Sequence, residues 1–355
     1  MAIKTLSENI NQAISDFKGV KQAIIDKGVE IPSGTPTSEY GAKISEIQSG
    51  GSDELKITDF SYFCYGGART DVLERLDTSQ GTSFNNMFYR CSNLTTIPKL
   101  DTSQGTSFNN MFYECSSLTE VPLFDTSSGT TFQNMFSGCS SLTEVPLFDT
   151  SQATSIRYMF YGCSRLTEIP LFDTSNVTDF NDTFGGCSSL VTIPQLDTSK
   201  GTDFNTMFVN CKSLVTIPQL NTDKARDLST MFMGCTSLVS VPRLNTAGAN
   251  CRYMFDGCSS LHTLELTSFS SSSAMFRGCS ALENLTVTGT ISVSNNYLDL
   301  SASTLLTVDS LLNVLNALAD NTGKTKRTIY LGSTNLAKLT DEQKAIATNK
   351  NYTLA

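Results

Sequence analysis

The chain has 355 residues, of which 39% are hydrophobic, and a formal net charge of -9 at pH 7. This length and apolar content are enough for one or more folded domains with a substantial core. The acidic balance excludes a basic, phosphate-binding surface, so we expect no nucleic-acid partner. We find no run of about 18 apolar residues and no secretion-signal pattern, so we expect neither membrane insertion nor export by the common route.

The first 50 residues predict an oligomerisation or attachment segment. Apolar residues recur there at alternating steps of three and four, which is the core pattern of a coiled coil about three heptads long. This seam consists of Ile3, Leu6, Ile10, Ala13, Phe17, Val20 and Ile24. We expect a homo-oligomer, and specifically a trimer, because Ile and Phe at core positions do not enforce a dimer. The alternative is an amphipathic helix lying on its own domain. The stretch after Gly28 is rich in Gly, Ser and Pro and predicts a tether.

Residues 51–290 are dominated by a repeat that a cysteine marks. The cysteines follow one another at steps of 24, and then of 23 and 21: Cys91, Cys115, Cys139, Cys163, Cys187, Cys211, Cys235, Cys258 and Cys279. A fixed period of this length is typical of a solenoid in which each coil, a strand and a turn, stacks on the last. Phe stands three residues before each cysteine, Leu three after it, and usually Ile or Val six after it. We expect these columns to form ladders in the core.

The repeated cysteine is best explained as a small buried hydrophobe. One cysteine per coil lacks the local spacing of a metal site, so we expect an inert thiol rather than a metal ligand or a redox group. An acidic column runs beside it: Asp101, Asp125, Asp149, Asp173 and Asp197, continued by Asn221 and Asn245. We expect these side chains to form Asx turns that accept backbone N–H groups. A calcium-binding column is the alternative.

Two columns change together and predict where a partner binds. In three consecutive coils the fifth residue after the cysteine is Glu and the eighth is Leu: Glu120 with Leu123, Glu144 with Leu147, and Glu168 with Leu171. Stacking explains residues that are the same in every coil, whereas residues that differ in register can answer to a ligand. Either the leucines face solvent as an apolar stripe edged by carboxylates, or they point into the core in place of Phe124, Phe148 and Phe172. We predict that the six Glu and Leu residues form the contact surface.

Residues 291–355 predict an α/β cap that closes the open end of the stack. The string "TVDSLLNVLNALADNTG" has apolar residues at helical spacing and predicts a helix that ends at Gly323. The string "RTIYLG" predicts a strand, and "TDEQKAIATNK" predicts a helix that opens with a capping box from Thr340 to Gln343. At the other end of the solenoid, "LKITDFSYFCYGG" predicts the first strand.

No catalytic constellation stands out in the sequence. The one histidine is His262, and a Ser/His/Asp or Cys/His mechanism would depend on it alone. Phosphate-binding loops and EF-hand spacings are missing as well. We therefore expect a protein that is not an enzyme and that has no cofactor and no metal.

The pattern "MFxGCxSLTxxPxxDTS", which covers about residues 76–287, resembles the BspA-like leucine-rich repeats and the related repeats of mycoplasma-type surface lipoproteins. The resemblance implies a β-rich, α+β solenoid, a right-handed leucine-rich-repeat-like coil of about nine repeats, and adhesion to proteins, cells or extracellular material. The N-terminal string "LSENINQAISDFKGVKQAIIDKGVEIPSGTPTSEYGAKISEI" resembles the start of phage tail and fibre proteins. Together they predict a virion fibre or decoration protein, assembled in the host cytoplasm. Its N-terminus would join other virion proteins, and its solenoid would bind a host-surface protein or glycan. The alternative is a bacterial cell-surface adhesin.

Overall fold

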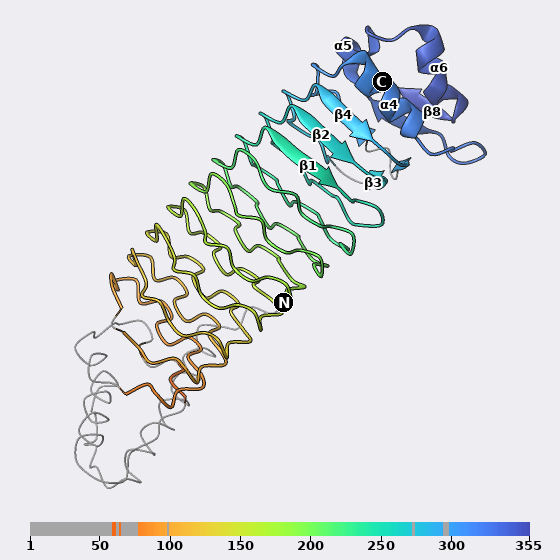
Figure 1. Cartoon of the computed structure of the whole chain (residues 1–355). Helices are drawn as coiled ribbons and strands as arrows, with labels where there is room; N and C mark the ends of the chain where they lie inside the picture. Colours follow the sequence, from red (N-terminus) through yellow and green to blue (C-terminus); the bar gives the residue numbers. More distant parts are fainter. Residues whose placement is uncertain (1–58, 62–63, 65–76, 98, 272–273, 294–297) are drawn as a thin grey trace, which may run out of the picture.

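The computed structural model describes residues 59–61, 64, 77–97, 99–271, 274–293 and 298–355. The segment 1–50, for which the sequence predicts a coiled coil and a tether, lies outside these residues, so its role stays a prediction. Figure 1 shows the coils stacked side by side in one row, with helices at the C-terminal end. In the described part of the chain, no helix combines the length and the apolar character that a membrane crossing requires.

The interior of the row contains the columns that the repeat predicts, together with a phenylalanine column seven residues before the cysteine, such as Phe108 and Phe132, that was not predicted. The rings of Phe112, Phe136 and Phe160 stack with centroids 5.4 and 5.7 Å apart, and all three side chains are fully buried. The repeat cysteines and the leucines three residues after them are buried beside this stack. One coil cannot bury its apolar face alone, so each coil depends on its neighbours for its core.

We number positions within a coil from its cysteine, so that +8 is the eighth residue after it. Positions -7 to -1 are bonded tightly from coil to coil: Phe108, Asn110, Phe112 and Glu114 each donate an N–H to the next coil, at 2.7 to 3.0 Å. The same segment folds into two successive β-turns, whose third residues, Asn110 and Glu114, have φ of +54° and +56°. Most coils place glycine at position -1, for example Gly138 with φ +78°, because glycine adopts this left-handed conformation without strain.

The expectation of one strand in every coil is wrong. In the described part of the 24-residue coils, parallel pairing is limited to isolated bridges such as Ser83 with Ser107, until β1 (Ser240–Leu244) begins. Position +7 is proline, as in Pro122, Pro146 and Pro170, and proline has no N–H to donate to a ladder. Of the predicted first strand, the described residues Asp59 and Phe60 make one such bridge with Ser83.

Regular strands form where the proline disappears. β1 still contains Pro242, and its pairing with β2 (Thr263–Leu266) is irregular between Val241 and Leu244. β2 and β4 (Asn284–Val287) lack proline and pair in register over four residues, which completes the parallel sheet β1-β2-β4. β3 (Phe269–Ser271) and β5 (Ile291–Val293) form a second, two-stranded parallel sheet.

The C-terminal end closes with three helices and a small parallel sheet, as Figure 1 shows. The sheet order is β6-β7-β8, with β6 at Leu298–Asp299, β7 at Arg327–Tyr330 and β8 at Tyr352–Leu354. The helices are α4 (Val308–Ala317), α5 (Gly332–Leu336) and α6 (Asp341–Asn349). Helix α4 lies against β4, and the Asn313 side chain accepts the N–H of Val287 at 2.7 Å.

Two details of this end test the sequence expectations. The capping box of α6 is confirmed, because Thr340 and Gln343 each accept the other's backbone N–H. Helix α4 ends at Ala317 rather than close to Gly323, because Leu318 leaves helical geometry and pairs with Ile291. Ala319 then donates its N–H to the Ile291 carbonyl at 2.9 Å, so the chain after α4 pairs with β5 by a parallel bridge.

Candidate interaction surface

The three leucines at position +8 lie on the surface. Leu123, Leu147 and Leu171 are 63, 58 and 59% exposed, which is far above the other apolar residues of their coils at positions +3, +6 and +9. The phenylalanines at +9, including Phe124 and Phe148, are buried and fill the interior instead. The structure therefore places the predicted leucines on an open face.

The three glutamates are exposed on the same stretch of each coil. Glu120, Glu144 and Glu168 stand at position +5, between the buried residues at +3 and +6. The proline at +7 is partly buried, and positions +5 and +8 are both exposed although they are three residues apart. The structure thus aligns a column of carboxylates beside a column of leucines, and their binding role stays a proposal.

A groove of about 860 Å³ runs along the other side of the leucine column. Leu123 and Leu147 form part of its lining, and the aspartates at position +10 face it from successive coils. Four aspartates and a single lysine line the groove: Asp77, Asp101, Asp125, Asp149 and Lys99. The groove is therefore lined both by exposed leucines and by a row of aspartates.

The aspartates form the Asx turns that the sequence predicts. Asp101 Oδ1 accepts the backbone N–H of Ser103 at 3.1 Å and its hydroxyl at 2.7 Å, and Asp125 is bonded to Ser127 in the same way. These hydrogen bonds lower the pKa of both carboxyls, because they stabilise the charged form. Asp101 and Asp125 are therefore ionised at neutral pH.

The threonine after each aspartate fixes this wall to the next coil. Thr102 is buried, and its hydroxyl donates to the Asp125 carbonyl at 2.7 Å; Thr126 donates to the Asp149 carbonyl at 2.9 Å. The repeated Asp-Thr-Ser sequence thus has two separate tasks. Asp turns the chain at the surface, and Thr bonds the turn to its neighbour.

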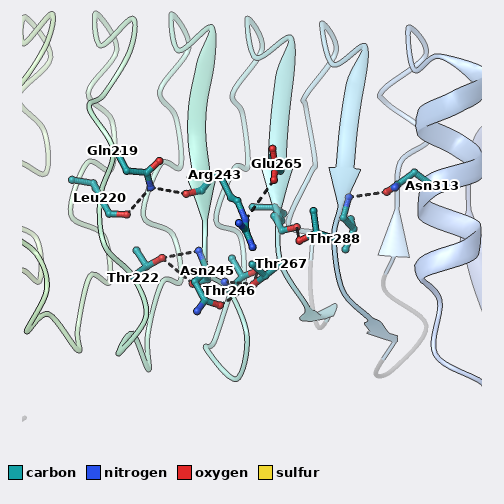
Figure 2. A network of polar contacts seen from close by, with 12 residues as sticks. Gln219, Leu220, Thr222, Arg243, Asn245, Thr246, Glu265, Thr267, Thr288 and Asn313 are labelled. Atoms are coloured by element: carbon teal, nitrogen blue, oxygen red, sulfur yellow. Dashed lines mark hydrogen bonds and ion pairs between the residues drawn. The ribbon is translucent and has the colours of Figure 1, made fainter.

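The next coils carry a different surface at the same positions. Gln195 and Gln219 replace leucine at +8, and each donates its side-chain amide to the backbone carbonyl of the following coil, at 2.6 and 2.7 Å. Figure 2 shows Gln219 reaching Arg243, which in turn lies 3.5 Å from Glu265. The side-chain amides at +8 in these coils are therefore engaged in hydrogen bonds within the protein. The leucine side chains at the same position have no polar group to do so.

The cysteine column carries no surface chemistry. All eleven thiols are free and buried, and each repeat thiol from Cys91 to Cys279 donates to a backbone carbonyl of the preceding coil, as Cys139 does to Phe112 at 3.1 Å. Burial raises the pKa of Cys187 and Cys235 to about 12. Within the described residues, no group of three or more His, Cys, Asp or Glu side chains is placed to hold a metal ion.

Sequence reasoning missed two features of this face. The aspartates were predicted to form turns, but not to line a groove together with the leucines. The signal for this was that each aspartate stands two residues after the +8 position of its coil. Sequence reasoning also missed a second exposed apolar column at +4 of the following coils, formed by Val191, Val215 and Val239, which are 41 to 48% exposed. Their N–H groups come closer to the carbonyl of the preceding coil along the row, from 3.4 Å at Val191 to 2.9 Å at Val239, which directly precedes β1.

Solved structures with a similar arrangement are distant in sequence. The internalin InlF of Listeria monocytogenes is 12% identical, with a TM-score of 0.29 and 90% of each chain covered. The functional domain of InlJ from Listeria monocytogenes, described as including a cysteine ladder, is 14% identical, with a TM-score of 0.24 over 74% of this chain and 71% of that one. A TLR13–ssRNA13 complex is 16% identical, with a TM-score of 0.34; the match covers 76% of this chain but only 42% of TLR13.

Sequence comparison gives a clearer result. A search of curated proteins found none that matches the chain. One family model matches three overlapping stretches, residues 58–168, 154–269 and 193–290, which together make up about two thirds of the chain. The match agrees with the resemblance of the cysteine repeat to mycoplasma-type surface repeats, and it does not reach the N-terminal string that resembles phage proteins. The chain therefore belongs to the family described as "Mycoplasma protein of unknown function, DUF285".

Proposed function

We propose that this chain is an adhesion or interaction protein whose solenoid binds a partner through the coils around Cys115, Cys139 and Cys163. The observation that carries the proposal is the exposed column of Leu123, Leu147 and Leu171. Stacking does not require leucine at +8, because the neighbouring coils place Lys99 and Gln195 there. An aligned apolar column edged by charged residues is the usual composition of a docking surface.

The proposal is for binding rather than catalysis. The imidazole of His262 is exposed, and its Nδ1 lies 2.6 Å from the backbone carbonyl of Ser260. This contact joins the ring to the main chain and not to a nucleophile or a carboxylate, so the geometry offers no activated group. No cofactor or metal is part of the proposal.

As its setting we propose the bacterial cell surface, because the repeats that the family model matches are the ones that resemble repeats of surface lipoproteins. The second candidate, a phage virion fibre or decoration protein, is favoured only by the string within residues 1–50. There the N-terminal segment would join the particle and the solenoid would face a host-surface protein or glycan. Both settings use the proposed homotrimer, and light scattering of the full chain tests it: a monomer would contradict the trimer.

The binding proposal is tested on arrays of immobilised extracellular-matrix proteins and surface glycans. We expect the wild type to bind at least one component, and Glu144→Lys with Leu147→Lys to weaken that binding by about 100-fold while the melting temperature stays nearly unchanged. The matched control places the same two lysines at the same columns of another coil, as Thr216→Lys with Gln219→Lys. Binding that both double variants weaken equally, or no binding by the wild type, would contradict the proposal.

A further inference from the structure

The leucine column is bordered by negative charge on both sides. Along each coil the chain passes from Glu at +5 to Leu at +8 and then to Asp at +10, as in Glu144, Leu147 and Asp149. Within the groove that the aspartates line, Lys99 is the one cation. A partner that buries the leucines must therefore bring positive charge to both flanks of its own apolar stripe.

The spacing between coils fits one kind of secondary structure better than another. From coil to coil, the core rings repeat at 5.4 Å from Phe112 to Phe136 and at 5.7 Å from Phe136 to Phe160, and those of Phe124 and Phe148 at 6.2 Å. An α-helix repeats every turn, or about 5.4 Å, which is closer to the mean of these three distances than the repeat of a strand is. An extended strand repeats a face every two residues, or about 6.7 Å, so it loses register over three coils.

The width and length of the surface agree with the same geometry. Positions +5 and +10 are five residues apart, so the two acidic columns are separated by at most about 17 Å. A helix with its side chains is about 10–12 Å wide, and flanking lysines can extend outward to reach both columns. The leucine column ends at Lys99 in one direction and at Gln195 in the other, which limits the contact to about three helical turns.

We infer that the leucine coils bind an amphipathic α-helix whose apolar stripe packs on Leu123, Leu147 and Leu171. The Lys or Arg side chains on both sides of that stripe meet Glu120, Glu144 and Glu168 on one flank and the aspartates at +10 on the other. This inference rests on the proposed function and names the chemistry of the partner.

The test uses synthetic peptides composed of Leu and Lys in equal proportions. One peptide is patterned with a period of 3.5 for a helix, the other alternates for a strand, and a third replaces Lys by Glu in the helical pattern. By fluorescence anisotropy we expect the basic helical peptide to bind about tenfold more tightly than the alternating one. We expect the acidic peptide not to bind, and binding of the basic helix to weaken by about tenfold between 0.05 and 0.5 M salt.

Variants of the protein separate a specific contact from general charge attraction. Leu147→Lys is expected to weaken binding of the basic helix by about tenfold or more, and Gln219→Lys to change it by less than about twofold. Equal binding of the helical and alternating peptides, or equal effects of the two variants, would overturn the inference. If the wild type binds an array component and Leu147→Lys abolishes that binding, but the wild type does not bind the basic helix, the proposed function stands and this inference is wrong. If the helix binds and no array component does, the proposed function is the one that fails.

Discussion

Two neighbouring stretches of the solenoid share one core and differ at the surface. The leucine coils (107–178) leave an apolar column exposed at +8, whereas the glutamine coils (179–226) fill the same column with amides bonded from coil to coil. The spacing starts to change only in the second glutamine coil. The N–H at +4 lies 3.4 Å from the carbonyl of the preceding coil at Thr119, Thr143 and Val191, and 3.1 Å from it at Val215. The repeat therefore sets the core, and the exposed positions are free to differ between the two stretches.

The largest effect should be the same in both stretches. Phe136→Ala removes a buried ring that stacks on Phe112 and Phe160, and Phe208→Ala does the same between Phe184 and Phe232. We expect each change to lower the free energy of unfolding by about 3–5 kcal/mol, since each leaves a cavity in a close-packed column. Urea unfolding measures both. A clear loss for one variant and none for the other would show that the two cores are not equivalent.

The buried thiols predict a pH dependence that also runs through both stretches. Burial raises the pKa of Cys187 to about 12 from an ordinary value near 9, and raises that of Cys163 as well. The folded chain therefore holds these protons more tightly than the unfolded chain. The contribution of these thiols to the free energy of unfolding is fully present below about pH 9. Above that pH the free energy of unfolding falls by up to about 1.4 kcal/mol per pH unit for each thiol.

Urea unfolding between pH 8 and 10.5 measures this slope. Cys187→Ala in the glutamine coils and Cys163→Ala in the leucine coils each remove one titrating thiol. Each variant should therefore show a smaller decrease of the free energy of unfolding with pH than the wild type. A free energy of unfolding that stays constant over this range would contradict the burial of the column.

The amide column should contribute stability that the leucine column does not. Gln219→Ala removes the hydrogen bonds from its side chain to the carbonyls of Arg243 and Leu220, at 2.7 and 2.9 Å. We expect a loss of about 1 kcal/mol, because the side chain is exposed and water replaces part of the bond. Thermal unfolding checks it. A variant as stable as the wild type would mean that the amides do not hold these coils together.

The smallest effect on stability should come from the leucines. Leu147→Ala is expected to change the free energy of unfolding by less than about 0.5 kcal/mol, because most of the side chain is in solvent. The same change should weaken partner binding measurably. A loss above about 2 kcal/mol would instead assign Leu147 to the core.

The sequence predicted the interior better than the surface. The core columns at -3, 0, +3 and +6 were predicted from residues that recur at one spacing, and the capping box of α6 from Thr340 and Gln343, whereas the buried phenylalanines at -7 were not predicted. The strands were mispredicted because apolar periodicity was given more weight than Pro122 and its counterparts, although proline already argued against a ladder. The exposure of Leu147 could not be decided from sequence, since both Leu147 and Phe148 were candidates for one interior position and only packing assigns it to the phenylalanine.

The central claim is tested most directly by hydrogen–deuterium exchange of the full chain. Exchange is compared with and without the basic helical peptide, or with and without the array component that the wild type binds. We predict that binding slows exchange in residues 119–125, 143–149 and 167–173, and leaves 191–197 and 215–221 unchanged, because only the leucine coils present the exposed column. Slowed exchange confined to the glutamine coils or to the C-terminal helices would place the binding surface elsewhere and contradict this account.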